Sequence, residues 1–414
     1  MAPSQKLISA SDESGVLCTY DQDSKAKPKR RSYVREVLDV FLPAGYPHTV
    51  TPDYTPYQIY DSLQAFSSTI AGLLSSRAVL QGFGVGNASS TATGAVLLTV
   101  LQESTGRLAT ILFAHRVGQA IEPECKFYRF LADIFNDTSM ILDILSPTLP
   151  GSSKVAALCV SGVLKALCGV SGASAKASLS AHFAKSGNLA ELNAKDGSQE
   201  TVISLMGMLV GSVFLRFVQG RLAVWVWTLT LLGIHLWTNY QAVRSVQMRT
   251  INRQRANLIS DELASRNRIL RPDEAAALEG ILYSRDWWTY GSVFARRAPR
   301  AEEIKQHELD HYRGKMYVIT VGGTIYLKDG ASTRDALMAW LESIPRGYWS
   351  KDILDVIDKS SHGKFSHDEF FQHLKTAGWD LDTGALETGP AVRIHVERRR
   401  VPRTREGLND VLLG

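Results

Sequence analysis

The stretch LAVWVWTLTLLGIHLWTNYQAV, residues 222–243, contains no Asp, Glu, Lys or Arg. As an α-helix it would be about 33 Å long, and the hydrocarbon core of a bilayer is about 30 Å thick. Its large aromatic residues are of the type that settles at membrane interfaces. They are Trp225, Trp227, Trp237 and Tyr240. The stretch therefore predicts a transmembrane helix in a mainly α-helical protein.

Two more charge-free stretches precede it, at residues 78–102 and 201–215. Gly220 offers a turn between the second of these and the helix predicted over 222–243, which indicates a helical hairpin across the membrane. We expect five or six membrane-associated helices in all, forming a multi-pass bundle. The remaining charge-poor stretches are residues 62–76 and 155–175.

Small residues recur every four positions in the stretch 78–102, and residues 207 and 211 repeat the interval. On one continuous helix they would share a face, and small residues let helix backbones approach closely in lipid. We predict a helix-packing face, and the alternative is that so many glycines end the helix. The predicted packing residues are Gly82, Gly86, Ser90, Gly94, Gly207 and Gly211.

A polar stripe runs through residues 126–145, KFYRFLADIFNDTSMILDIL. Its polar side chains recur at intervals of three or four, so they share one face of an otherwise apolar helix. Such a face is usually solvated. In a membrane bundle it would instead face the interior, where costly ionisable groups mark a pathway or a ligand site. Both alternatives stay open. The stripe consists of Lys126, Arg129, Asp133, Asn136 and Asp137.

A second polar segment, AKDGSQE at residues 194–200, comes directly before the apolar run that begins at Thr201. Asp196 and Gln199 have the spacing of a capping box, and Glu200 would complement the positive end of a helix dipole. We therefore expect this segment to form the start of a membrane helix.

Taken together, these segments resemble the Root UVB Sensitive family, membrane proteins defined by a long domain of unknown function. The resemblance covers about residues 34–255 and rests on short motifs, including FLP at 41–43, PDY at 52–54, DSLQAF at 61–66 and AKDGSQE. Its motif residues are candidates for a shared site or interface. They are Pro52, Asp53, Tyr54, Gln58, Asp61, Gln64, Lys195, Asp196, Ser198, Gln199 and Glu200. The chain departs from the family pattern at Tyr60, where the family usually has Trp.

The resemblance implies an intracellular multi-pass membrane protein linked to vitamin B6 homeostasis and the UV-B response, without an accepted enzymatic activity. We therefore expect a non-enzymatic protein that binds or transports a small molecule or scaffolds partners, with no cofactor and no metal. Its expected partners are the bilayer, a small-molecule ligand, and a second copy or a family paralogue. The net charge of +5 over 414 residues is too balanced for a dedicated nucleic-acid binder, so none is expected.

The sequence pattern predicts four segments. They are a disordered basic tail at 1–35, the membrane domain at 36–245, a helical connector at 246–310 and a small α+β domain at 311–414. The tail's basic cluster either signals nuclear import or fixes the cytosolic side of a membrane protein. Basic residues after the span predict a cytosolic location for all that follows. These residues are Arg244, Arg249, Arg253 and Arg255.

The predicted α+β domain contains a hairpin, a capped helix and a last strand. Gly322-Gly323 separates two apolar runs at 316–321 and 324–328, which predicts the hairpin. Ser332 with Asp335 predicts the start of the helix, and alternating apolar residues at 392–396 predict the strand.

Two motifs in this half give alternatives that we rank low. His307, Glu308 and His311 fit H-E-x-x-H, the pattern of a zinc-dependent hydrolase, but the surrounding helix is polar. Residues 358–369, DKSSHGKFSHDE, have the length of a calcium loop. Only Asp358 and Glu369 are carboxylates at ligand positions, which is too little charge for tight calcium binding.

Overall fold

The protein is described from a computed structural model, which covers residues 7–12, 15–21, 33, 39–82, 92–185, 187–282, 293–300, 302–344 and 367–397. Contacts divide the chain into two compact units. One comprises residues 1–285 and 349–389, and the other comprises residues 286–348 and 390–414. We describe each unit by itself.

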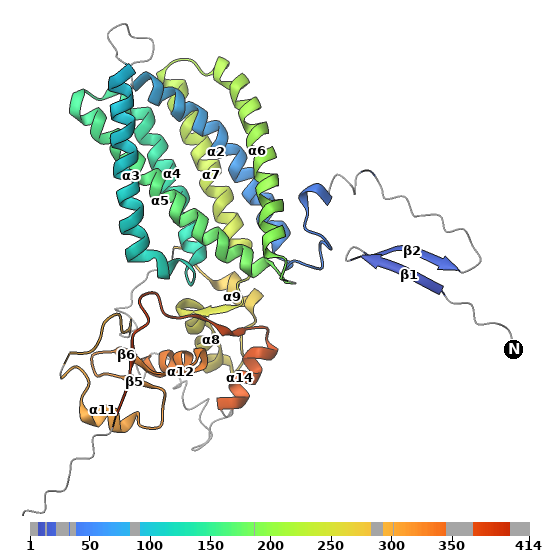
Figure 1. The fold of residues 1–414 in the computed structure, drawn as a ribbon, viewed down its shortest axis with the longest axis vertical. Helices are drawn as coiled ribbons and strands as arrows, with labels where there is room; N and C mark the ends of the chain where they lie inside the picture. Colours follow the sequence, from blue (N-terminus) through green and yellow to red (C-terminus); the bar gives the residue numbers. More distant parts are fainter. Residues whose placement is uncertain are drawn as a thin grey trace, which may run out of the picture. The chain divides into compact units, whose positions relative to one another are not determined.

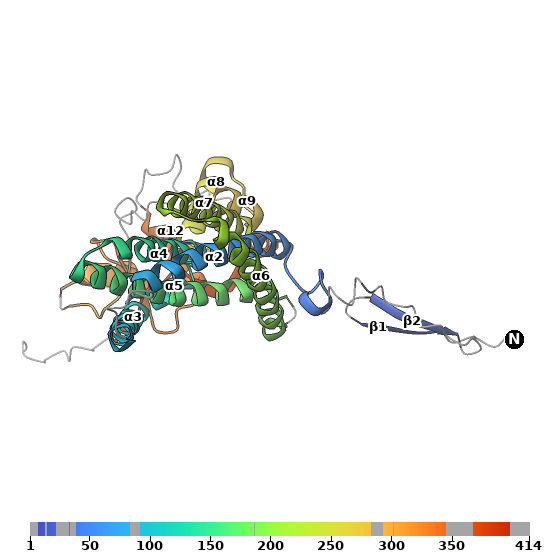
Figure 2. The ribbon, with the colours of Figure 1, turned by 90° about the horizontal axis from the view of Figure 1, so that it is seen from above.

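The first unit is built around six long helices that run alongside one another (Figures 1 and 2). They are α2 (Tyr54–Gly82), α3 (Ala92–Ile121), α4 (Cys125–Leu145), α5 (Gly151–Phe183), α6 (Leu189–Phe217) and α7 (Arg221–Ser245), with the 3-10 turn η1 (Ser146–Thr148) after α4. Helix α4 packs against α5, α2 and α7, whereas α3 packs mainly against α5. The predicted mainly helical fold is confirmed.

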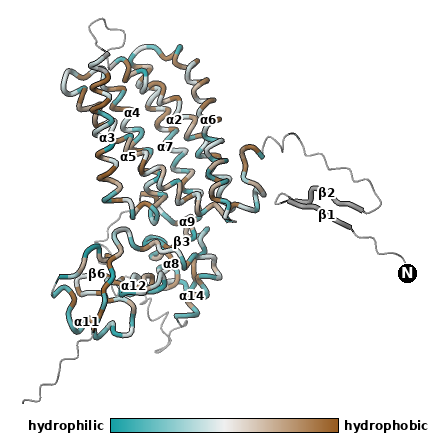
Figure 3. The backbone as a smooth tube through the Cα atoms, in the orientation of Figure 1, coloured by the Kyte–Doolittle hydropathy of each residue, from teal (hydrophilic) through white to brown (hydrophobic). Residues whose placement is uncertain are grey.

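Four of these helices are long and apolar enough to cross a membrane: Val96–Ile121 within α3, and all of α5, α6 and α7. Apolar residues recur along the length of these helices (Figure 3). Helices α3 and α6 expose large aliphatic side chains, such as Leu97, Ile111 and Leu209. An apolar exterior of this extent is unfavourable in water and favourable in lipid. Helices α2 and α4 carry more polar residues and lie between the others.

The helices approach one another closely at glycines. A Cβ on Gly207 of α6 would lie 2.9 Å from the Cβ of Thr69 and 3.3 Å from the carbonyl oxygen of Phe66, both in α2. A Cβ on Gly162 of α5 would lie 2.9 Å from the carbonyl oxygen of Gln102 in α3. Backbones this close leave no room for a side chain, so these glycines set the spacing of the helix pairs.

The stretch 78–102 is divided between two helices. Helix α2 ends at Gly82 and α3 begins at Ala92, so Gly82 and Gly94 lie on different helices and do not share one packing face. Gly86 and Ser90 lie outside the described residues. Three closely spaced glycines lower helix propensity here, which favours a helix end over a continuous helix.

Below the bundle, the first unit continues through β3 (Thr250–Asn252), α8 (Arg253–Arg266) and α9 (Pro272–Leu278). It also includes α14 (His367–Thr376) and β7 (Asp380–Ala385), and β7 pairs in parallel with β3. The side chain of Asn252 caps α8 by accepting a hydrogen bond from the backbone N–H of Arg255.

Part of the segment predicted to be disordered forms a β-hairpin. Strand β1 (Leu7–Asp12) pairs antiparallel with β2 (Gly15–Asp21). Val16, Thr19 and Tyr20 have high strand propensity, and this local preference offsets the polar character of the tail. The basic cluster that follows lies outside the described residues, apart from Tyr33 within it.

Within its described residues, 293–300, 302–344 and 390–397, the second unit contains a small mixed sheet and two helices. Its elements are β4 (Val293–Phe294), α11 (Gln306–His311), β5 (Tyr317–Ile319), β6 (Thr324–Lys328), α12 (Thr333–Ser343) and β8 (Arg393–Ile394). Strands β5 and β6 form the predicted hairpin, with Gly323 at φ +76°. Ser332 and Asp335 form the predicted capping box of α12, and β8 pairs with β6.

Candidate functional site

The polar stripe of α4 faces the interior of the bundle. Lys126, Asp133 and Asp137 are buried, and Arg129 and Asn136 are partly buried. The stripe is therefore not a solvated face, and its role as a pathway or a ligand site stays a prediction. Ionisable groups in such a position must find partners on neighbouring helices, because desolvation is costly.

Two aspartates of the stripe share one histidine of α7. His235 Nδ1 lies 2.7 Å from Asp137 Oδ1, and His235 Nε2 lies 3.4 Å from Asp133 Oδ2. The amides of Gln64 in α2 and Asn239 in α7 both donate hydrogen bonds to Asp133 Oδ2. We call these five residues the carboxylate-histidine cluster. It joins three helices through one buried carboxylate.

The stripe continues on both sides of this cluster. Toward the start of α4, the guanidinium of Arg129 lies 2.7 Å from Asp61 in α2. Toward the end of α4, Asp143 has no exposed surface and accepts hydrogen bonds from Ser75 (2.7 Å) and Ser161 (2.5 Å). Lys165 of α5 forms an ion pair with it at 2.6 Å.

We call the polar face of α4 from Arg129 to Asp143, with its partners, the polar column. At 1.5 Å per residue it is about 21 Å long, most of a hydrocarbon core of about 30 Å. Sequence reasoning missed Asp143, Lys165, His235 and Asn239. His235 and Asn239 are spaced four residues apart in the charge-free stretch. This spacing puts two polar side chains on one face of an apolar helix, and it could have indicated that they belong to the site.

The AKDGSQE motif meets α2 and α5 beside the column. Gln58 donates hydrogen bonds to Asp196 (2.6 Å) and Gln199 (3.0 Å). Lys176 of α5 pairs with Asp196 at 2.7 Å and with Glu200 at 2.8 Å. The predicted helix start at this motif is wrong, because α6 already begins at Leu189. The capping-box spacing thus reflects a polar face within the helix.

The other motif residues hold the chain that leads into α2. Lys195 donates to the carbonyl oxygens of Asp39 (2.5 Å) and Val40 (3.1 Å), and Gln199 donates to that of Phe41 (2.7 Å). Ser198 bonds within its own helix, to the carbonyl oxygen of Ala194. Pro52 directly precedes Asp53. These residues fix the entry to the bundle.

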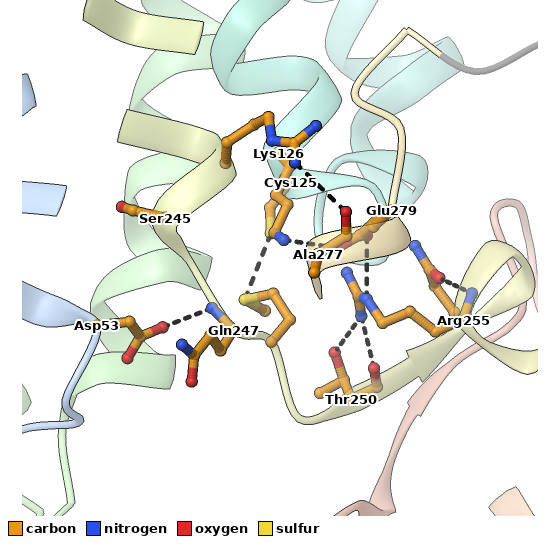
Figure 4. Close-up of polar contacts among 12 residues, drawn as sticks. Asp53, Cys125, Lys126, Ser245, Gln247, Thr250, Arg255, Ala277 and Glu279 are labelled. Atoms are coloured by element: carbon orange, nitrogen blue, oxygen red, sulfur yellow. Dashed lines mark hydrogen bonds and ion pairs between the residues drawn. The ribbon is translucent and has the colours of Figure 1, made fainter. Parts of the chain in front are cut away.

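Asp53 joins the start of α2 to α5 and to the segment after α7. It lies 2.9 Å from His182 and accepts a hydrogen bond from the backbone N–H of Gln247 at 2.6 Å (Figure 4). Burial raises the pKa of Asp53, but His182 and the Gln247 N–H outweigh it and lower that pKa to about 2. Tyr54, the next residue, is buried and its ring packs edge-on against Phe183.

Lys126 does not belong to the polar column. Its ammonium pairs with Glu279 after α9 at 2.5 Å, and Arg255 of α8 pairs with the same carboxylate at 3.1 Å (Figure 4). Arg255 also donates to the carbonyl oxygen of Thr250 at 2.5 Å. We call Lys126, Arg255 and Glu279 the foot cluster. Burial raises the pKa of Glu279, but its two cationic partners lower it below its usual value.

A pocket of about 380 Å³ lies between helix ends and β7. Its lining includes the ring of Trp379 and ionisable side chains of both signs. These are Glu122, His182, Arg249 and Asp380. This volume falls in the range of small-molecule sites. The lining contains no residue of the polar column, so the pocket is a separate candidate site for a small polar ligand.

The H-E-x-x-H motif lies at α11, a helix of six residues. Glu308 is buried, and its two carboxylate oxygens accept hydrogen bonds from the backbone N–H groups of Lys305 and Val321, each at 2.7 Å. In the part of the chain that the structure describes, no three His, Cys, Asp or Glu side chains are grouped as metal ligands. Of residues 358–369, which have the length of a calcium loop, residues 358–366 lie outside the described residues.

Comparison with known proteins gives one consistent match. Residues 27–267 match the family described as "Vitamin B6 photo-protection and homoeostasis domain". RUS family member 1 of Dictyostelium discoideum is 40% identical over 260 residues, covering 62% of this chain and 49% of that protein. Protein root UVB sensitive 3 of Arabidopsis thaliana is 36% identical over 249 residues, covering 60% of this chain and 56% of that protein. The chain thus spans about half the length of these two relatives.

A third relative, protein root UVB sensitive 2, chloroplastic, of Arabidopsis thaliana, is 25% identical over 384 residues, covering 88% of this chain and 86% of that protein. No solved structure matches the chain. The family match extends over more than half of the sequence and includes the whole bundle. The chain belongs to the Root UVB sensitive family.

Proposed function

We propose that this chain is a non-enzymatic protein of an intracellular membrane, and that its bundle binds a small polar molecule and carries it through the membrane. The observation that carries this proposal is the polar column, a series of buried ionisable side chains about 21 Å long inside a bundle with an apolar exterior. Ionisable groups at that depth are expensive, and in membrane proteins they mark pathways for ions and solutes.

Unpaired atoms in the column support a binding role. Asp137 Oδ2, Asn239 Oδ1 and Arg129 Nε are buried, and within the described residues they have no hydrogen-bond partner. Buried polar atoms are almost always bonded, and the requirement is stricter in lipid, where water cannot serve. Two acceptors and one donor, spread along the polar column, suit a polar solute that carries both kinds of group and meets them in turn.

The family description supports the choice of solute. Vitamin B6 compounds are small, polar ring compounds with hydroxyl groups and a ring nitrogen, and these groups could bond both to the unpaired acceptors and to the unpaired donor. We therefore propose the vitamin B6 class as the solute to test first.

Uptake of radiolabelled pyridoxine into liposomes that contain the purified full chain tests the proposal. We expect the wild type to take up pyridoxine above empty liposomes, and Asp133→Asn, which keeps the volume and removes the charge, to lower uptake at least tenfold. Asp261→Asn, an exposed residue of α8, is the matched control and should keep full uptake. Unchanged uptake in a folded Asp133→Asn protein, or no uptake of any vitamin B6 compound by the wild type, would contradict the proposal.

The membrane orientation is part of the same proposal. We propose that the segment after α7 lies on the cytosolic side. Of the four arginines that suggested this, Arg244 and Arg249 are exposed, whereas Arg255 is buried in the foot cluster. The positive-inside argument therefore rests on the two exposed arginines. Labelling of a single cysteine introduced at Arg249, with a membrane-impermeant reagent in sealed vesicles of known orientation, tests it.

A further inference from the structure

We infer that the carboxylate-histidine cluster holds an exchangeable proton, and that solute movement through the bundle is coupled to movement of this proton. The coupling rests on the proposed transport function. The proton site itself rests on the geometry of Asp133, Asp137 and His235.

The first argument is the position of the imidazole between two carboxylates. Both ring nitrogens of His235 face acceptor oxygens, at 2.7 Å from Asp137 Oδ1 and 3.4 Å from Asp133 Oδ2. A neutral imidazole has one N–H, so its second nitrogen would turn a lone pair toward a carboxylate. The amide nitrogen of Gln64 lies 3.5 Å from the same His235 Nε2, at the limit of a hydrogen bond, so it competes only weakly with the nearer carboxylate. An added proton, on the ring or on the facing carboxyl, makes both carboxylate contacts attractive.

The second argument is the balance of charge. Asp133, Asp137 and His235 together carry two negative charges when His235 is neutral, one when His235 is protonated, and none when a carboxyl also binds a proton. A net charge in a desolvated interior is penalised strongly. The cluster therefore favours the states with added protons.

The neighbouring charges do not correct this imbalance. On one side, Arg129 is paired with Asp61, and on the other, Asp143 is paired with Lys165. Gln64 brings no charge, and Cys168 of α5 adds a thiol that is electrostatically linked to both aspartates. Each pair is already neutral, so the excess negative charge stays at the two aspartates that share His235.

The third argument comes from another helix. Asn239 of α7 has no exposed surface, its amide nitrogen donates to Asp133, and its Oδ1 has no partner within the described residues. Asp137 Oδ2 is unpaired as well. A proton on Asp137 would give the cluster a donor that it lacks, and a solute donor could later take the place of that proton.

The polar column continues beyond the cluster, toward the end of α4. Beyond the cluster, Asp143 is bonded to Ser75, Ser161 and Lys165, and the side chain of Lys165 is 43% exposed. The end of the column at Asp143 therefore reaches the surface of the bundle. Solute binding would displace the proton from Asp137, and the cluster would regain a proton after the solute leaves.

Infrared difference spectroscopy of the full chain in liposomes tests the proton site without any solute. Spectra recorded between about pH 5 and pH 8, the range in which histidine-linked groups titrate, should contain the C=O stretch of a buried carboxylic acid. This band should be lost in Asp137→Asn and kept in the exposed control Asp261→Asn. If Asp137→Asn does not fold, His235→Gln should shift the titration of the band. A wild type with no titrating carboxylic acid band overturns the inference.

Pyridoxine uptake under a proton gradient, with the membrane potential clamped, tests the coupling. One coupled proton allows about tenfold accumulation for each pH unit of the gradient. We expect the wild type to respond to the gradient, and His235→Gln to take up less and to lose the response. Uptake that ignores the gradient in the wild type overturns the coupling. A titrating band without any uptake contradicts the transport proposal and leaves the proton site supported.

Discussion

Two clusters of buried charge include side chains of α4, and they differ in how completely they are paired. In the foot cluster, one carboxylate, Glu279, lies between Lys126 and Arg255, and Arg255 is further bonded to Thr250. In the carboxylate-histidine cluster, two aspartates share one histidine, and buried acceptor atoms stay without partners. Burial of charge alone therefore does not mark a site. In our proposal, a fully bonded cluster joins parts of the chain, and an incompletely bonded one binds a solute.

This difference predicts that the two clusters fail in different ways when a charge is removed. Glu279→Gln leaves Lys126 and Arg255 buried without a counter-charge, which should lower the free energy of unfolding by about 3–5 kcal/mol. Thermal unfolding of the purified protein in detergent measures the effect. Glu103→Gln is the control, because Glu103 and Arg107 form an exposed pair, and it should change stability by at most about 1 kcal/mol. Equal effects of the two variants would contradict the assignment of the foot cluster as a structural joint.

A second prediction concerns Asp53, which pairs with His182 at the entry to the bundle and loses its charge at low pH. The pKa of Asp53 is lowered from 3.8 to about 2, so its contribution to stability is complete above about pH 4 and is lost as the pH falls toward 2. The loss amounts to about 2 kcal/mol. Asp53→Asn should flatten the stability profile in this window and nowhere else. An unchanged slope between pH 4 and pH 2, measured by unfolding across that range, would refute the role assigned to the Asp53 pairs.

The third prediction asks whether close approach at a glycine, rather than charge, holds α6 against α2, the helix that supplies Asp61 and Gln64 to the column. Gly207→Ala should lower the free energy of unfolding by about 1–3 kcal/mol, because the new methyl group meets the Phe66 carbonyl oxygen and Thr69 in α2. Gly197→Ala, in the same helix with nothing within 4 Å, is the matched control and should be neutral or stabilising by up to about 1 kcal/mol. A stable Gly207→Ala protein would mean that α2 and α6 can separate without cost.

The sequence predicts the local features of this molecule well. The charge-free stretch 222–243 lies within α7, the polar stripe lies on one face of α4, and the hairpin before α12 has its predicted turn. Each of these depends on periodicity, length or turn chemistry, which are properties of neighbouring residues.

The pairing of distant residues could not be predicted from one sequence. Glu279 pairs with Lys126 across 153 positions, and His235 meets Asp137 across 98. A histidine within an apolar span resembles an ordinary core residue until its partners are known. The same limit explains Asp196, whose spacing to Gln199 predicted a helix cap although its actual partners are Gln58 and Lys176, on two other helices.

One paired measurement tests the central claim, that the column is a binding path and the foot cluster is a joint. Pyridoxine uptake and thermal unfolding are measured side by side for the full chain, Asp133→Asn and Glu279→Gln. We expect Asp133→Asn to lose at least tenfold in uptake while it unfolds close to the wild-type temperature, and Glu279→Gln to unfold far below it. Full uptake by a stable Asp133→Asn protein would contradict the claim, because the column would then be structural like the foot cluster.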